Sequence, residues 1–158
     1  MDRRAVTLAG MLALSLAAAA CASGPIAISS EPLAGTIGGS EWTLASAETN
    51  ATLSANSPTF VARAYGQALP ACTGAGSAAN GNGLILNLPR TAGDYRVGES
   101  LSQTFYMTAG NTNYVATQGR VIVEEVTTTT IRAGAHFRFD DANEVDGQFA
   151  VTVCPAPP

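Results

Sequence analysis

The chain has 158 residues, a net charge of −4 and 13% charged residues, which suits one globular domain with its own hydrophobic core. The acidic balance argues against a nucleic-acid partner, because the phosphate backbone repels a negative surface. With one histidine and three cysteines, the sequence also offers few ligands for a resident zinc ion. We therefore expect neither a nucleic-acid partner nor a bound cofactor.

The N-terminus has the features of an export signal. Arg3 and Arg4 form a positive start, and residues 5–20 carry no charge and no proline and are rich in Leu and Ala. This apolar run is shorter than the ~20 residues of a membrane-spanning helix. It also lacks the polar residues at a 3.6 period that a buried helix of the folded domain would show. We predict that residues 1–20 form a helical signal peptide.

A run of alanines leads directly into Cys21, and this resembles the lipobox of bacterial lipoproteins. The resemblance implies cleavage before Cys21 and acyl chains such as palmitate on that residue, although Ala18 stands where the motif usually has Leu, Val or Ile. Several acyl chains would hold the protein stably on a membrane. Ala22 after the cysteine favours the outer membrane in such lipoproteins, so the resemblance implies the cell envelope. Secretion after an ordinary cut behind Ala20 or Ala22 stays open as the alternative.

Two cysteines, Cys72 and Cys154, remain after Cys21 is modified or removed. In an oxidising compartment an even pair of cysteines predicts a disulfide. In the chain-entropy model, a bridge that closes such a long loop stabilises the fold by about 4.5 kcal/mol. The alternative, free or metal-binding thiols, is less favoured because no second cysteine stands at Cys-x-x-Cys spacing.

Beyond the signal, the sequence alternates between short β-type runs and turns. Residues 21–34 are small and polar with Gly and Pro, which predicts a flexible tether. From residue 35, β-branched and aromatic residues gather in runs separated by Gly, Asn, Asp and Pro. We predict a single all-β domain over residues 35–158, an antiparallel β-sandwich or small β-barrel of about eight strands. The expected strands cover residues 41–49, 59–65, 83–88, 93–97, 104–108, 120–126, 129–139 and 148–154.

The alternation is clearest near the C-terminus. In residues 135–139 the odd positions are apolar and the even positions polar, and Phe149, Val151 and Val153 share one face of the next strand. These two strands are expected to form a hairpin through residues 140–146. Trp42 is expected to be a core anchor under the first strand.

Three segments resemble small bacterial lipoproteins of uncharacterised function. Residues 35–42 carry a G-x-x-x-G-x-x-W opening, residues 93–97 a G-x-Y-x-V strand, and residues 145–149 a closing V-x-G-x-F strand. The resemblance spans most of residues 35–154 and implies an all-β fold without implying an activity. The Gly and Trp of the opening also resemble the lipocalin Gly-x-Trp signature, with a spacing one residue longer.

Two local features are candidate sites. His136, the single histidine, falls on the polar face of its strand, which predicts a solvent-facing side chain. The acidic hairpin segment offers oxygen ligands for calcium, but its spacing is one residue off the EF-hand pattern and lacks the closing glutamate. A solvated loop is the favoured interpretation, and the weak calcium candidates are Asp140, Asp141, Asn143 and Asp146.

The motif inventory favours a protein without catalysis. No Gly-x-Ser-x-Gly nucleophile motif is present. We therefore expect a non-enzymatic envelope lipoprotein that has a structural role or binds a partner protein, polymer or small ligand. One alternative is a lipocalin-like small-ligand carrier or protease inhibitor. A second is a hydrolase that works through carboxylates.

Overall fold

The structure, a computed structural model, describes residues 25–50, 57–74, 83–98, 105–107 and 113–155. The predicted signal peptide and Cys21 lie outside these residues. The described part is all-β, which confirms the predicted fold class. Nowhere in this part is there a helix that could cross a membrane.

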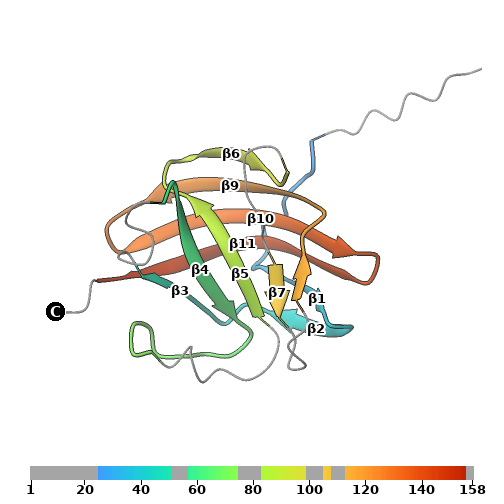
Figure 1. Cartoon of the computed structure of the whole chain (residues 1–158), viewed down its shortest axis with the longest axis horizontal. Coiled ribbons are helices and arrows are strands. Elements are labelled where there is room, and N and C mark those ends of the chain that lie inside the picture. The colour runs from blue at the N-terminus through green and yellow to red at the C-terminus, as the bar shows by residue number, and fades with distance from the viewer. Residues whose placement is uncertain (1–24, 51–56, 75–82, 99–104, 108–112, 156–158) are drawn as a thin grey trace, which may run out of the picture.

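The described strands belong to one sheet (Figure 1). Its order is β6-β9-β10-β11-β3-β4-β5-β7-β8, with β1 pairing with both β11 and β2. Every pairing is antiparallel except that of β11 with β3. Along the chain the strands are β1 (Ala34–Ile37), β2 (Ser40–Thr43), β3 (Ser46–Asn50), β4 (Thr59–Tyr65), β5 (Gly83–Pro89), β6 (Gly93–Arg96), β7 (Phe105–Met107), β8 (Asn113–Val115), β9 (Gln118–Val126), β10 (Thr130–Asp140) and β11 (Asn143–Cys154).

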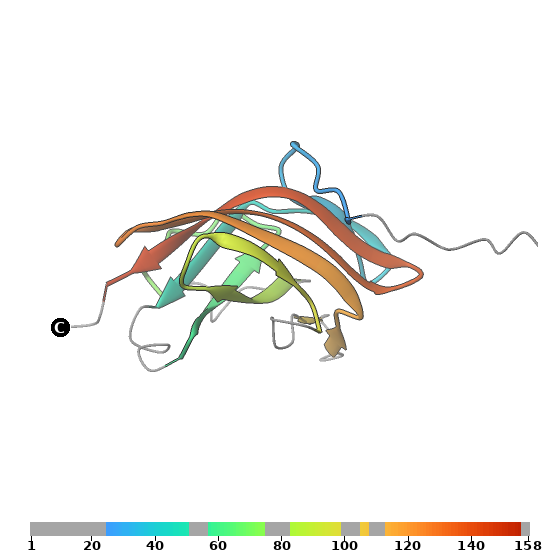
Figure 2. The ribbon, with the colours of Figure 1, turned by 90° about the horizontal axis from the view of Figure 1, so that it is seen from above.

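The sheet curls into a half-barrel, so its two halves cross. In Figure 1, strands β4 and β5 run steeply across the long strands β9, β10 and β11. In the view turned by 90°, the orange and red strands arch over the green ones (Figure 2). Of the two predicted architectures, the small β-barrel therefore describes the observed sheet better than a β-sandwich, which would have two separately hydrogen-bonded sheets. Among the described strands, β6 and β8 end the order.

The core lies between the two crossing halves. Odd positions of β10 and β11 are buried, as the alternation predicts, and Phe137 and Val151 are fully enclosed. Even positions of β4 and β5 meet them, with Ala62 and Leu86 also fully enclosed. Trp42 is 7% exposed and belongs to this core, as expected. The concave side is thus filled by side chains.

Two expected strands depart most from their predicted bounds, and β1 and β8 were not predicted as strands. The run expected over 41–49 divides, because the backbone N–H of Leu44 bonds to Leu33 on one side and that of Ala45 bonds to Tyr65 on the other. The chain changes partners there and becomes β2 and β3. Strand β11 begins at Asn143 instead of residue 148, because the hairpin turn needs only residues 141 and 142.

The segment expected to be a flexible tether is instead fixed to the sheet over residues 26–33, which we call the strap. Leu33 is fully buried, and its N–H donates to the carbonyl of Gln148 at 2.9 Å. The Gln148 side chain donates to the carbonyl of Ser29 at 2.8 Å. At the strap's start, the Arg120 guanidinium donates to the carbonyl of Ile26 at 2.7 Å. Composition predicted mobility here, but these contacts hold the backbone.

Candidate functional site

The outer face of β3 and β11 is partly covered by residues 66–74, which we call the covering loop. Leu69 and Ala71 of this loop face Ser46 and Thr152 across a pocket of about 270 Å³. The Ser46 hydroxyl donates to the carbonyl of Gln67 at 2.8 Å. One end of the loop is thereby tied to the edge of β3.

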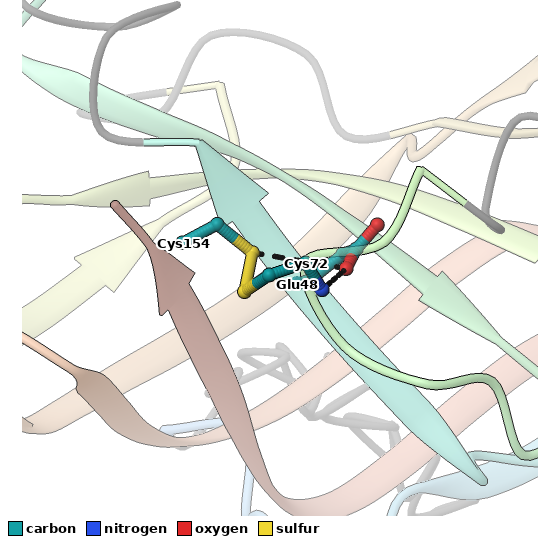
Figure 3. A group of neighbouring side chains, drawn as sticks. All are labelled: Glu48, Cys72 and Cys154. Atoms are coloured by element: carbon teal, nitrogen blue, oxygen red, sulfur yellow. Dashed lines mark hydrogen bonds between the residues drawn. A yellow bond between two sulfur atoms is a disulfide. The ribbon is translucent and has the colours of Figure 1, made fainter. Parts of the chain in front are cut away.

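The other end of the covering loop is tied covalently. Cys72 and Cys154 form a disulfide with their Cα atoms 5.3 Å apart, which confirms the predicted pairing (Figure 3). Cys154 is the last residue of β11 and is 8% exposed, whereas Cys72 is exposed in the loop. The bridge therefore joins a sheet position to an otherwise exposed turn.

Glu48 of β3 points at this bridge (Figure 3). Its Oε2 accepts a hydrogen bond from the backbone N–H of Cys72 at 2.8 Å and lies 3.8 Å from Sγ of Cys154. A disulfide sulfur carries no proton, so the second distance is a contact and not a hydrogen bond. Cys72 adopts a φ of 62°, which is unfavourable for a residue with a side chain. The bridge and the Glu48 carboxylate together hold that backbone.

Tyr65, the last residue of β4, lines the same pocket. Its hydroxyl is buried and makes no hydrogen bond of normal geometry to the described residues, although the Arg63 side chain lies close enough to act on its pKa. Burial raises the pKa of Tyr65, while the neighbouring Arg63 opposes the rise. A phenol in this state is a neutral hydrogen-bond donor at physiological pH. A buried polar group without a partner is costly, so its position in a pocket has to be explained.

The pocket brings together unlike groups that could recognise a ligand. A carboxylate from Glu48 and a phenol from Tyr65 lie on walls that also include the small apolar residues Ala47, Ala71 and Ala150. Such walls bind small molecules, with a few polar groups fixing the orientation. Nothing in this set is an acid–base–nucleophile arrangement.

His136 lies on the outer face of β10, the face that the alternation predicts. Its side chain is only 19% exposed, less than expected for a solvent-facing residue. Glu144 approaches Nε2 at 3.8 Å and Asp146 approaches Nδ1 at 3.9 Å. Both carboxylates come from β11, where they stand on the same outer face. The contacts are those of a surface charge cluster.

Of the four weak calcium candidates, Asp140 and Asn143 are in contact, but the four do not converge as a set. Asp140 accepts hydrogen bonds from the Ala142 N–H at 2.9 Å and from the Asn143 amide at 2.7 Å. The Ala142 N–H is the main cause that lowers the pKa of Asp140. Asp141 bonds to Arg138 at 2.6 Å. These interactions close a tight turn and use the oxygens that a cation would need.

Asp146, the fourth calcium candidate, belongs to a different neighbourhood. Its Oδ1 accepts the backbone N–H of Ser29 at 3.0 Å, which ties it to the strap. In the described part of the chain, the acidic and sulfur-bearing side chains that converge are Glu48, Cys72 and Cys154. In the described residues, the side chains that could share a metal ion therefore lie at the disulfide and not in the acidic hairpin.

Sequence reasoning found the two cysteines and missed the other members of this site. Alternation along β3 and β4 places Glu48 and Tyr65 on the polar face, where most side chains are merely solvated. Only the return of the covering loop over that face encloses them, and no local pattern encodes that return. The one signal in the sequence was Cys72. Its predicted bridge to Cys154 brings the segment around Cys72 back to the sheet, where its backbone N–H bonds to Glu48.

Comparison with known proteins assigns the chain to no family and to no known fold. No protein-family model matches the chain, and no curated protein and no solved structure matches it at a significant level.

Proposed function

We propose that this protein is a non-catalytic binding domain, held at the cell envelope by lipid on Cys21, and that the pocket under the covering loop is its binding site. The observation that carries the proposal is the pocket and its lining residue Tyr65, whose buried hydroxyl makes no hydrogen bond of normal geometry to the described residues. A bound molecule that accepts a hydrogen bond would satisfy this group and recover the cost of burying it.

The size of the pocket limits the ligand. A volume of about 270 Å³ is slightly below the ~300–1,000 Å³ range of typical ligand pockets. The occupant is therefore a small molecule with at least one acceptor oxygen or nitrogen. A carrier of the lipocalin type has less support, because the interior is occupied by large buried side chains such as Phe137 and Leu86.

The strap supports the anchoring part of the proposal. It fixes the chain from Ile26 onward, and Arg120 and Gln148 hold it from the sheet. Five residues of fully extended chain reach at most about 18 Å. A lipid on Cys21 would therefore keep the outer face of β9–β11 close to the membrane, whatever conformation the connecting residues adopt.

The test is native mass spectrometry of the chain expressed with its own N-terminus and extracted from membranes. The expected mass corresponds to cleavage before Cys21, added acyl groups, a closed disulfide and a small bound molecule. In Tyr65→Phe the bound molecule is lost while the fold stays as stable or gains stability, because an unsatisfied buried hydroxyl is removed. Tyr95→Phe is the control, since that hydroxyl already bonds to Thr91.

Two results would contradict separate parts of the proposal. A soluble, unlipidated product cut after Ala20 or Ala22 would overturn the anchor. No bound mass in the wild type, or the same bound mass in Tyr65→Phe, would overturn the pocket as the binding site.

A further inference from the structure

We propose that Glu48, Cys72 and Cys154 form a binding site for a thiophilic divalent cation such as Zn²⁺ once the disulfide is reduced. The ligand atoms of these three side chains all lie within 4.8 Å of one another. This site goes beyond the proposed binding function and does not depend on it. It shares the Glu48 carboxylate with the small-molecule pocket but adds the two sulfur atoms, whereas the test of that pocket uses Tyr65.

The sheet holds two of the three ligands in place without help from the sulfur bond. Cys154 pairs with Asn50 and Thr152 with Glu48 in the parallel ladder between β11 and β3. Glu48 and Cys154 therefore keep their relative positions when the bridge opens. The third ligand, Cys72, stays close through its backbone N–H, which donates to Oε2 of Glu48 at 2.8 Å.

The distances that zinc requires are within reach. Zinc binds thiolate sulfur at about 2.3 Å and carboxylate oxygen at about 2.0–2.2 Å, so two sulfurs of a tetrahedral site stand roughly 3.8 Å apart. Reduction lets the sulfurs separate by side-chain rotation, while the Cα atoms of Cys72 and Cys154, now 5.3 Å apart, need not move far. The Glu48 carboxylate already lies next to the bridge, with Oε2 3.8 Å from Sγ of Cys154 (Figure 3).

The chemistry balances with a dithiol as reductant. The dithiol attacks the sulfur of Cys72, the more exposed residue of the bridge, supplies two electrons and two protons, and leaves as its own disulfide, so that two thiols remain on the protein. Zn²⁺ then displaces both thiol protons and forms two Zn–S bonds and one Zn–O bond to Glu48. Water completes four-coordination. Two thiolates and one carboxylate surround the dication, so its charge is more than neutralised.

The experiment titrates the full-length chain with Zn²⁺, and in parallel with Co²⁺ as a spectroscopic probe. A Cys21→Ser background leaves Cys72 and Cys154 as the remaining thiols. The reduced protein is expected to bind one metal ion per chain and to show sulfur-to-cobalt charge-transfer absorption, whereas the oxidised protein shows neither. Glu48→Gln is expected to weaken binding by roughly 10-fold or more, since it replaces a charged ligand with a neutral amide. Glu125→Gln, an exposed glutamate on β9, is the matched control and should leave the affinity unchanged.

Each other outcome overturns the site. Equal metal affinity in the oxidised protein would show that the thiolates are not ligands. Equal affinity in Glu48→Gln would remove the carboxylate from the site. Far-UV circular dichroism follows the fold throughout, and loss of the strand signal on reduction that Zn²⁺ does not restore would also count against the proposal, because the sheet positions the ligands.

Discussion

At the scale of single residues, Arg120 joins three parts of the molecule. Its guanidinium donates two hydrogen bonds to Asp94, at 2.9 and 2.8 Å, and a third to the carbonyl of Ile26. One side chain thus connects β6 to β9 and β9 to the strap. A planar guanidinium suits this role, because its donors leave in fixed directions that match a carboxylate and a carbonyl together.

The Asp94–Arg120 pair predicts a specific dependence of stability on pH. The hydrogen bond from Arg120 is the main cause that lowers the pKa of Asp94 below its ordinary value of 3.8. A carboxyl with a lowered folded-state pKa stabilises the fold above its unfolded pKa, and that contribution is lost as pH falls through the folded value. Asp94→Asn should therefore lower Tm at pH 7 by a small amount, because the pair is exposed, and the difference should shrink below pH ~4.

Thermal unfolding of wild type and Asp94→Asn at pH 7 and pH 2.5 makes the comparison. Glu41→Gln, an exposed glutamate on β2, is the control for general loss of negative charge. A Tm difference that stays the same at both pH values would mean that the ionised pair is not its source.

The candidate site shows how far single residues can be predicted from sequence. Cys72 and Cys154 could be paired because cysteine chemistry and export restrict the alternatives. Glu48 and Tyr65 could be assigned only to the polar face of a strand. Nothing in the local sequence indicates that a loop from elsewhere in the chain covers that face. The weak calcium candidates in the acidic hairpin show the same limit. Asp140 and Asp146 are close in sequence but serve different neighbours, a tight turn and the strap.

At the scale of elements, the strap and β11 approach each other closely because Gly147 separates them. Gly147 has a φ of 139°, and a Cβ built there would stand 2.6 Å from the carbonyl oxygen of Glu31 and 2.7 Å from the backbone of Leu33. The expected strand begins only at residue 148, just after Gly147, although the resemblance implies a strand over residues 145–149. That the strap packs against Gly147 could not be predicted without knowing which segment lies on it.

Gly147→Ala should therefore displace the strap. We expect it to lower the free energy of unfolding by roughly 1–3 kcal/mol more than Gly39→Ala does. Gly39 is the matched control, because it also has a positive φ, 75°, but has no atom within 4 Å of its missing Cβ. Denaturant unfolding of both variants gives the comparison. Equal losses would show that backbone conformation, and not contact with the strap, limits both sites.

The strands were predicted best where a strand keeps the same neighbours along its whole length. β10 pairs with β9 and β11 throughout, and its alternating pattern located it to within one residue at each end. The run over 41–49 failed because its backbone leaves β1 and joins β4 partway along. A change of hydrogen-bond partner is a property of the sheet and leaves no period in the sequence.

At the scale of the whole molecule, the disulfide closes a long loop and fastens the last strand to the middle of the chain. The separation of 82 residues corresponds to about 4.5 kcal/mol in the chain-entropy model. Replacing Cys72 and Cys154 together with alanine, in a Cys21→Ser background, should lower the free energy of unfolding by an amount approaching that value. Guanidinium unfolding at equilibrium measures it. A loss below about 1 kcal/mol would mean that the unfolded chain gains little freedom when the bridge is absent.

The place of β11 in the sheet has a consequence for the order in which the molecule can be made. Residues near its start pair with β1, its last residues pair with β3, and most of its length pairs with β10. Among the described strands, the one that comes last along the chain is thus the one that joins the earliest strands to the rest. A chain that emerges N-terminus first must leave the strap, β1 and β3 unpaired on that side until its closing segment has emerged. Until β11 is available, these strands keep unpaired edges, and such edges are prone to pair with other chains.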